Sequence, residues 1–205
     1  MLDQIKKLKD LIDNASPETL AKSIDDCHFK GVFSLVIGGE ENGTLTRVFM
    51  SEKEISPYDV QLHSHRYDLK ITTLTNGIRH HVKLARPKRE TKFLTSEYKY
   101  QSPWNGGKGL EYLGPVVLSV ASYDLPSLAL IDMCSDDVHT VSCRAGSMWV
   151  VEEGGFTNLN HSYVYGSPFI LDGLYNKPSQ YQIADRWQAV KKVIKKHLLD
   201  LQMAE

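Results

Sequence analysis

The chain lacks the features that mark membrane, secreted or nucleic-acid-binding proteins. Its 205 residues carry a formal net charge of -1, which gives no overall attraction to nucleic acid or to an acidic membrane surface. No apolar run approaches the roughly 18 residues needed to cross a bilayer, and the N-terminal residues lack the apolar core of a signal peptide. We therefore expect a cytoplasmic protein that binds neither nucleic acid polymers nor membranes.

Cysteine and the common enzyme motifs are also scarce. Cys27, Cys134 and Cys143 are odd in number and widely spaced, and they form no CxxC zinc pair. A cytoplasmic setting disfavours disulfides, so these are expected to be reduced structural thiols. The sequence has no phosphate-binding loop, no dinucleotide glycine motif and no serine nucleophile elbow, so it does not belong to the enzyme classes that those motifs identify.

Helical patterns occur only at the two ends of the chain. Leu2, Ile5, Leu8 and Ile12 recur at helical spacing. Ser16 followed by Pro17 is a helix start signal, and the following pattern predicts a second helix that continues to Cys27. Near the other end, one apolar stripe predicts a helix from Ile183 to Leu201.

The middle of the chain is a succession of short strand-prone segments. They cover about residues 32–37, 44–50, 63–75, 78–84, 112–123, 127–133, 138–143, 147–152 and 161–165. Asn76-Gly77 is a strong hairpin signal. Glu153-Gly154-Gly155 is expected to be a turn, and residues 86–109 are expected to be irregular with a loop at Trp104–Gly107. Many short strands with helices confined to the ends predict an antiparallel β-barrel or sandwich.

The most informative stretch is His63-Ser64-His65, which begins a strand-prone segment. Residues i and i+2 of a strand point to the same face, so both imidazoles would aim at one point. A divalent metal ion is the commonest reason for such a pair. The alternative is that these are ordinary surface or core histidines.

A catalytic metal site needs at least a third ligand, with a position left open for water or substrate. Asp68 is close in sequence, but on a straight strand it would point to the face opposite to His63 and His65. It can reach the site only if a bulge follows His65. His139, which opens a later strand after an acidic turn, is the best distant candidate. A set of two or three histidines with one carboxylate suits iron(II), manganese, nickel or zinc.

These motifs resemble those of the cupin superfamily. His63-Ser64-His65, an acid shortly afterwards, and Gly77 twelve residues past His65 resemble the first cupin motif. Asp136-Asp137-Val138-His139 with the following Ala145-Gly146 resembles the second. The expected glutamate position falls near Leu69 or Lys70, so Asp68 comes early, and a site of three histidines is an alternative. The residues around Arg66 also resemble uncharacterised cupin-like proteins of bacteriophages and bacteria.

The resemblance implies a mainly β fold, a cupin-like antiparallel β-barrel of the jelly-roll type. On this interpretation residues 1–30 form an N-terminal helical segment and residues 31–175 form the barrel. Residues 180–205 form a C-terminal amphipathic helix that packs on the barrel or on a partner, so the whole chain is a single domain. Because cupin relatives are often dimers, a homodimer is a further expectation.

Several side chains near the proposed site are candidates for handling a substrate. Tyr67 shares the parity of His63 and His65, so we predict that it reaches the cavity as a catalytic hydrogen-bond donor. Glu152 and Glu153 follow a hydrophobic strand, and one of them, Glu152 in the first place, is a candidate general base or extra ligand if the strand end faces the cavity, although glutamates at turns are usually solvated. Arg66 is a candidate for substrate binding.

A second group of cations lies on the segment after Asn76-Gly77. If Arg79, His81 and Lys83 point into the barrel, they form a wall suited to a carboxylate or phosphate. If Ile78 and Val82 are the core face instead, the cations lie in solvent. Both arrangements fit the sequence, and Arg79 and His81 are the substrate-binding residues that the first one predicts.

The sequence therefore favours a metal-dependent cupin-type enzyme that acts on a small polar or anionic molecule, which includes phosphorylated and nucleotide-like compounds. A hydrolase or lyase would account for the cations near the site, and a dioxygenase would account for the histidines and carboxylate equally well. The resemblance also allows an isomerase. The alternative is a module of cupin fold that binds or sequesters a small molecule without turnover.

Overall fold

The computed structural model describes residues 1–27, 30–39, 44–86, 92–102, 106–156, 161–167, 179–180 and 184–203. The predicted features at Trp104, Asn105, Ile183 and the tip of the turn after Gly39 lie outside these ranges. The helices are α1 (Leu2–Asp13), α2 (Pro17–Leu20) and α3 (Ala184–Gln202). The strands are β1 (Ile24–Asp25), β2 (Val32–Gly39), β3 (Leu45–Ser51), β4 (Leu62–His63), β5 (Tyr67–Thr73), β6 (Ile78–Lys83), β7 (Lys92–Gln101), β8 (Gly109–Leu125), β9 (Leu130–Met133), β10 (His139–Cys143), β11 (Met148–Phe156), β12 (Ser162–Gly166) and β13 (Ser179–Gln180).

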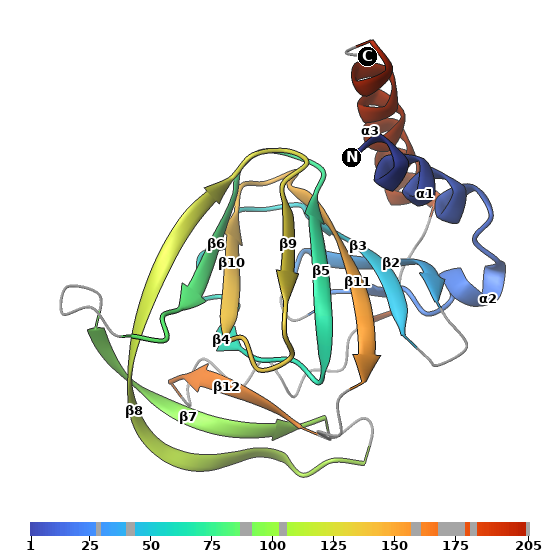
Figure 1. The fold of residues 1–205 in the computed structure, drawn as a ribbon. Helices are drawn as coiled ribbons and strands as arrows, with labels where there is room; N and C mark the ends of the chain where they lie inside the picture. Colours follow the sequence, from blue (N-terminus) through green and yellow to red (C-terminus); the bar gives the residue numbers. More distant parts are fainter. Residues whose placement is uncertain are drawn as a thin grey trace.

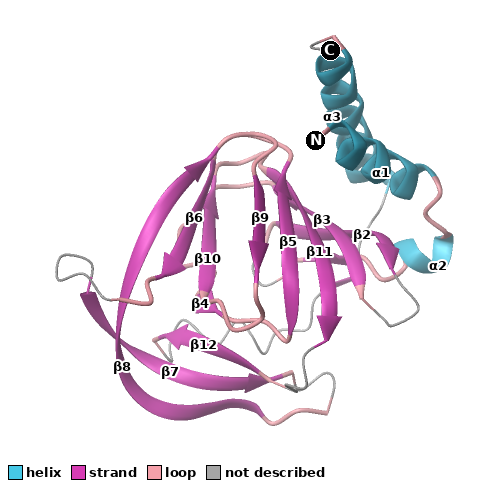
Figure 2. Ribbon diagram, in the orientation of Figure 1, coloured by secondary structure: helices cyan, strands magenta, loops and turns pink. Residues whose placement is uncertain are grey.

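The strands form two antiparallel sheets, and the described helices lie only at the ends of the chain (Figure 2). The first sheet has the order β13-β1-β2-β3-β11-β5-β9. In the second, the pairings β10-β4-β12-β7-β8-β6 return from β6 to β10 and so close a ring. The expected fold class, a mainly β protein built from antiparallel strands with helices at both ends, is confirmed.

Two apolar clusters hold this arrangement together, one on each face of the first sheet. On one face, Ile5 and Leu8 of α1 and Ile194 of α3 pack against Leu35 and Val150, and Figure 1 shows α1 and α3 side by side next to β2 and β3. The other face contributes the second cluster, in which buried residues of both sheets pack together: Val32, Leu69, Ile71, Ile78, Met133, Cys143, Trp149 and Val151. The second cluster therefore marks the space between the two sheets.

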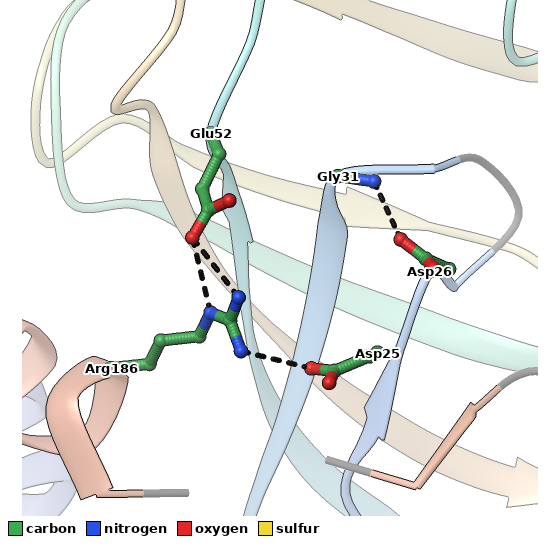
Figure 3. A network of polar contacts seen from close by, with 5 residues as sticks. All are labelled: Asp25, Asp26, Gly31, Glu52 and Arg186. Carbon is green, nitrogen blue, oxygen red and sulfur yellow. Dashed lines mark hydrogen bonds and ion pairs between the residues drawn. The ribbon is translucent and has the colours of Figure 1, made fainter. Parts of the chain in front are cut away.

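The C-terminal helix is also fixed by polar contacts. Figure 3 shows the Arg186 guanidinium between two carboxylates, at 3.2 Å from Asp25 and 3.1 Å from Glu52. The same guanidinium lies 3.5 Å from the centre of the Phe33 ring. Among the described residues, α3 thus packs on α1 and on the first sheet of its own chain.

The predicted second helix is too long. Ser16 is its N-cap as expected, because the Ser16 side chain accepts a hydrogen bond from the backbone N–H of Thr19. The helix nevertheless ends at Leu20, and Ile24 enters a strand that pairs with β2 and β13. Pairing with a strand on each side gives the backbone of this segment the hydrogen-bond partners that a longer helix would otherwise provide.

Three other local predictions are wrong, because strand pairing extends or redirects segments whose composition indicates turns or loops. Asn76-Gly77 does not close a hairpin: β5 belongs to the first sheet and β6 to the second, and Gly77 has a φ of +88° at this corner. Glu153–Gly155 is not a turn, because β11 continues to Phe156 with a register shift after Glu153. The segment expected to be irregular contains β7, which pairs along ten residues with β8.

In the described part of the chain, no helix combines the length and the apolar character needed to cross a membrane. Cys27 and Cys143 are buried and Cys134 is exposed, and all three thiols are free. Burial raises the pKa of the Cys27 thiol to about 12, so it stays protonated at neutral pH.

Candidate metal centre

The histidine pair lies where the chain leaves the second sheet for the first. His63 ends β4, whereas His65 lies in the connection to β5, so the single strand expected through both is interrupted. Ser64 fixes this connection: its N–H donates to the Tyr163 carbonyl and its hydroxyl accepts the Tyr163 N–H, each at 2.9 Å. The two imidazoles still meet, with ring centres 4.8 Å apart.

His139 joins the pair from β10, as the sequence predicts. It is the direct cross-strand partner of His63, and its Nε2 lies 2.9 Å from the Nε2 of His65. One ligand atom from each of the three histidines can be chosen so that all lie within 4.8 Å of one another, and this group could hold a metal ion. Two segments that are distant in sequence, residues 63–65 and β10, thus place three imidazole nitrogens around one point.

In two of these rings the Nδ1 atom also has a hydrogen-bond partner. Nδ1 of His63 lies 2.7 Å from the Gln61 carbonyl oxygen, which can only accept, so in the neutral ring Nδ1 carries the proton and Nε2 the lone pair. Nδ1 of His139 lies 2.8 Å from Nε2 of His80. Such partners behind the ligand commonly set the tautomer and the ring orientation of a metal-binding histidine.

His80 is the residue of this site that the sequence interpretation missed. It lies on β6, on the same face as Ile78, and Ile78 packs in the cluster between the sheets. The ring centres of His80 and His139 are 5.0 Å apart. The alternation of Ile78, His80 and Val82 already indicated that His80 shares the core face.

The buried imidazoles are held in their neutral form. Burial is the main reason that the pKa of His139 lies well below its usual value, and the neighbouring His63, His65 and His80 lower it further. Burial, with a smaller effect from His81, lowers the pKa of His80 to about 4. Neutral imidazole is the form that binds metal, so the protein environment favours the state that a ligand requires.

The arrangement fits a metal ion in number, chemistry and spacing. A tetrahedral ion with nitrogen ligands at about 2.0–2.1 Å holds two of those nitrogens about 3.4 Å apart. The 2.9 Å between His65 and His139 and the 4.8 Å upper limit of the group lie on either side of that spacing, so small side-chain shifts suffice. Among the described residues the group contains no carboxylate, and three protein ligands leave a position for water or substrate.

Asp68, the predicted carboxylate ligand, lies outside this group. It is exposed on β5, and its Oδ1 accepts the N–H of Ser135 at 2.8 Å. The carbonyl of the same Ser135 accepts the N–H of His65 at 2.9 Å. Asp68 and His65 therefore fix the turn that precedes His139 from both sides, which helps to bring β10 to the site.

Tyr67 packs against the cluster between the sheets, and its ring centre is 6.0 Å from that of His65. Burial raises the pKa of its hydroxyl well above the usual value, and the charge of Glu153 and a hydrogen bond to it add to the effect. Glu153 in turn accepts from Arg47 Nε at 2.9 Å and from the Leu45 N–H at 3.0 Å. The Tyr67 hydroxyl is thus protonated, and the Glu153 carboxylate accepts its proton.

Glu152, the predicted catalytic carboxylate, lies on the other face of β11. Its carboxylate contacts Gln4 and Lys7 of α1 at 2.5 Å each. The strand was expected to end at Glu152; because it continues, the next residue, Glu153, is the one that turns toward Tyr67. Glu152 and Glu153 are adjacent, so one carboxylate contacts α1 and the other lies beside Tyr67.

Arg79 and His81 lie on the face of β6 opposite to His80. Arg79 is exposed and forms a two-bond ion pair with Asp124 at 2.7 and 2.9 Å. Both ring nitrogens of His81 lie 2.8 Å from serine hydroxyls, those of Ser122 on β8 and Ser142 on β10. The structure therefore matches the second of the two arrangements expected from the sequence, in which Ile78 is on the core face.

An apolar and aromatic wall adjoins His63. Val164 of β12 is its second cross-strand partner, and Tyr98 of β7 pairs with Val164, so the three share one face. Val164 and Tyr98 are both buried, and the ring centre of Tyr112 lies 5.4 Å from that of Tyr98. The polar group thus has tyrosines on two sides, Tyr67 and Tyr98.

Comparison with known proteins gives likenesses in structure only. No protein family matches the chain, and no curated protein matches it. Among solved structures 19 chains match. One is Streptomyces PAC13, a nucleoside dehydratase, with 10% identity and a TM-score of 0.35 over 73% of this chain and 91% of that one.

Two more are a cupin-like protein of Thermotoga maritima and an L-ribose isomerase of Cellulomonas parahominis. The first shows 11% identity and a TM-score of 0.29 over 76% of this chain and 80% of that one. The second shows 13% identity and a TM-score of 0.35 over 93% of this chain and 92% of that one. Identities and TM-scores this low say nothing of ligand or reaction, which must come from the site itself.

Proposed function

We propose that the chain is a metal-dependent cupin-type enzyme that acts on a small polar or anionic molecule. His63, His65 and His139 are the ligands in this proposal, and the ion is iron, manganese, nickel or zinc, all of which accept imidazole. The observation that carries it is the convergence of the His63 and His65 imidazoles with that of His139 from a distant strand, with His63 Nδ1 held by a carbonyl and His139 Nδ1 held by His80.

The proposed division of work follows from what surrounds the group. An ion with an open position supplies a Lewis acid to a bound oxygen or nitrogen atom of the substrate. Tyr67 would turn the proton of its hydroxyl from Glu153, which accepts it in this structure, to the bound substrate, and Glu153 is itself held by Arg47. Arg66 is next to both His65 and Tyr67 in the chain, and its charge acts on the Tyr67 hydroxyl, so it is the cation we assign to an anionic substrate.

The second candidate function is a binding module of the same fold without turnover. Its support is that the described residues around the histidines offer a hydrogen-bond donor and apolar walls, while the carboxylate of Glu153 is already bonded to Arg47 and Leu45. Such a site holds a ligand without needing a general base.

The first test of the proposal is whether the protein binds a metal ion. Protein purified without added metal is analysed by elemental mass spectrometry and then titrated with zinc, manganese, iron(II) and nickel in a calorimeter. We expect about one ion per chain, and we expect His63→Ala and His65→Ala to lose it. The control is His161→Ala, which removes a histidine outside the group. A wild-type protein that takes up none of the four ions would contradict the proposal.

Turnover separates enzyme from binding module. The metal-loaded protein is incubated with pools of small polar and phosphorylated compounds, and products are followed by proton and phosphorus NMR. The enzyme proposal expects a product whose formation falls in Tyr67→Phe and disappears in His65→Ala. Saturable ligand binding to the metal-loaded protein, with no product from the same pools, would instead support the module.

A further inference from the structure

His80 occupies a defined place behind the histidine group. Its Nε2 lies 2.8 Å from Nδ1 of His139, while Nε2 of His139 lies 2.9 Å from His65. His139 is therefore the middle member of a row of three imidazoles. His80 contacts the edge of the His139 ring that is turned away from His65, so it cannot share an ion with the His139 Nε2.

The row has two internally consistent proton arrangements. Either each imidazole donates in the direction from His65 to His80, or each donates in the reverse direction. When the lone pair of His139 Nε2 is used as a ligand, its only ring proton must be on Nδ1. His139 then donates to His80, and only a neutral His80 with a lone pair on Nε2 completes the bond.

We infer that His80 is a positioning residue that fixes the tautomer and the ring orientation of His139. This inference rests on the proposed metal site and adds a residue to it. The strand geometry supports the role, because β6 lies between β8 and β10 and the backbone of His80 is paired with Tyr123 on one side and Val141 on the other. His80 is only 5% exposed, so its ring has little freedom to leave His139.

The inference predicts a loss of metal affinity without the loss of a ligand. Removing such a partner behind a metal-binding histidine typically weakens metal binding by about 10–100-fold. His80→Leu removes the acceptor and keeps an apolar side chain of similar size between the sheets. His80→Gln keeps an oxygen acceptor that reaches about as far as the imidazole Nε2, so it should recover most of the affinity.

His81 provides the matched control. It is the next residue, it is also buried, and its ring is bonded to Ser122 and Ser142 on the opposite face of the strand. His81→Leu should lower the unfolding temperature of the metal-free protein because it breaks these bonds, but it should leave zinc affinity within about threefold of wild type. Comparing the two leucine variants separates positioning of the ligand from general damage to the sheet.

The measurement is zinc competition against a chromogenic chelator, with the unfolding temperature of each metal-free variant recorded beside it. Long-range proton–nitrogen NMR of the zinc-loaded wild type should show the His139 proton on Nδ1. Equal zinc affinity in wild type and His80→Leu overturns the inference and leaves the metal site standing. Equal losses in His80→Leu and His80→Gln overturn it as well, because the acceptor would then be irrelevant. A wild type that binds no zinc, manganese, iron(II) or nickel overturns both the site and the inference.

Discussion

Two pairs of neighbouring residues show how the two faces of one strand divide the work of this protein. On β6, His80 turns toward the histidine group and His81 bonds to serines on the other face. On β11, Glu153 turns toward Tyr67 and Arg47, and Glu152 binds α1. In each pair the residue type is the same, so what differs is only the face on which alternation places it. Position along the strand, rather than chemistry, decides which histidine or carboxylate can serve the site.

The largest expected effect is the loss of zinc affinity when a proposed ligand, His139, is replaced. The comparison is His81, a histidine that bonds to serines on the opposite face of β6. His139→Ala should weaken zinc binding on the order of 1,000-fold, about 4 kcal/mol, because two imidazoles hold the ion far less well than three. His81→Ala should bind zinc almost as wild type does. Calorimetric titration of both variants checks this, and a comparable loss in His81→Ala would show that the two faces are not separate.

The glutamates offer the next comparison, in stability rather than in binding. Glu153→Ala leaves the Arg47 guanidinium without its carboxylate partner in a largely buried position, which should cost about 3 kcal/mol of unfolding free energy. Glu152→Ala loses its contacts with Gln4 and with Lys7, whose side chain is 56% exposed, and should cost less than about 1 kcal/mol. Urea unfolding measures both, and equal losses would contradict the placement of these carboxylates.

The sequence was sufficient for the parts of the site that depend on residue type and short spacing. The i, i+2 spacing of His63 and His65 predicted that the two imidazoles meet. The position of His139 at the start of a later strand made it the candidate third ligand. The mainly β class with helices at the ends also followed from turn signals and periodicity. These features depend on residue type and on short sequence spacing, so they can be predicted from the sequence alone.

The parts that depend on how strands are distributed between sheets were not predictable in the same way. Asn76-Gly77 has the composition of a hairpin turn, yet β5 and β6 pair with different neighbours and the turn becomes a corner. Glycines after Glu153 indicate a turn, yet pairing with β5 carries the strand onward. His80 is a different case, because its parity with Ile78 was available and only the assignment of its role was missing.

Asp68 allows the sequence interpretation and the observed geometry to be tested against each other. Asp68→Asn keeps an oxygen that can accept the Ser135 N–H but removes the charge that a metal ligand would provide. The geometry predicts zinc affinity within about threefold of wild type, because the group of histidines is unchanged. A loss as large as that of His139→Ala, measured in the same titration, would make Asp68 a ligand after all.

Arg79 should give the smallest effect, because its ion pair with Asp124 is fully exposed to water. Arg79→Ala should change neither zinc affinity nor ligand binding, and its stability should be close to that of wild type.

The hydrogen bond from Arg79 lowers the pKa of the Asp124 carboxyl, so the small stability from this pair is present at neutral pH. It is lost as the pH falls through that lowered pKa, where the carboxyl becomes protonated in the folded protein. Urea unfolding of Arg79→Ala and wild type should therefore differ least in acid. A ligand whose affinity drops in Arg79→Ala at neutral pH would instead place a binding surface on the outer face of β6.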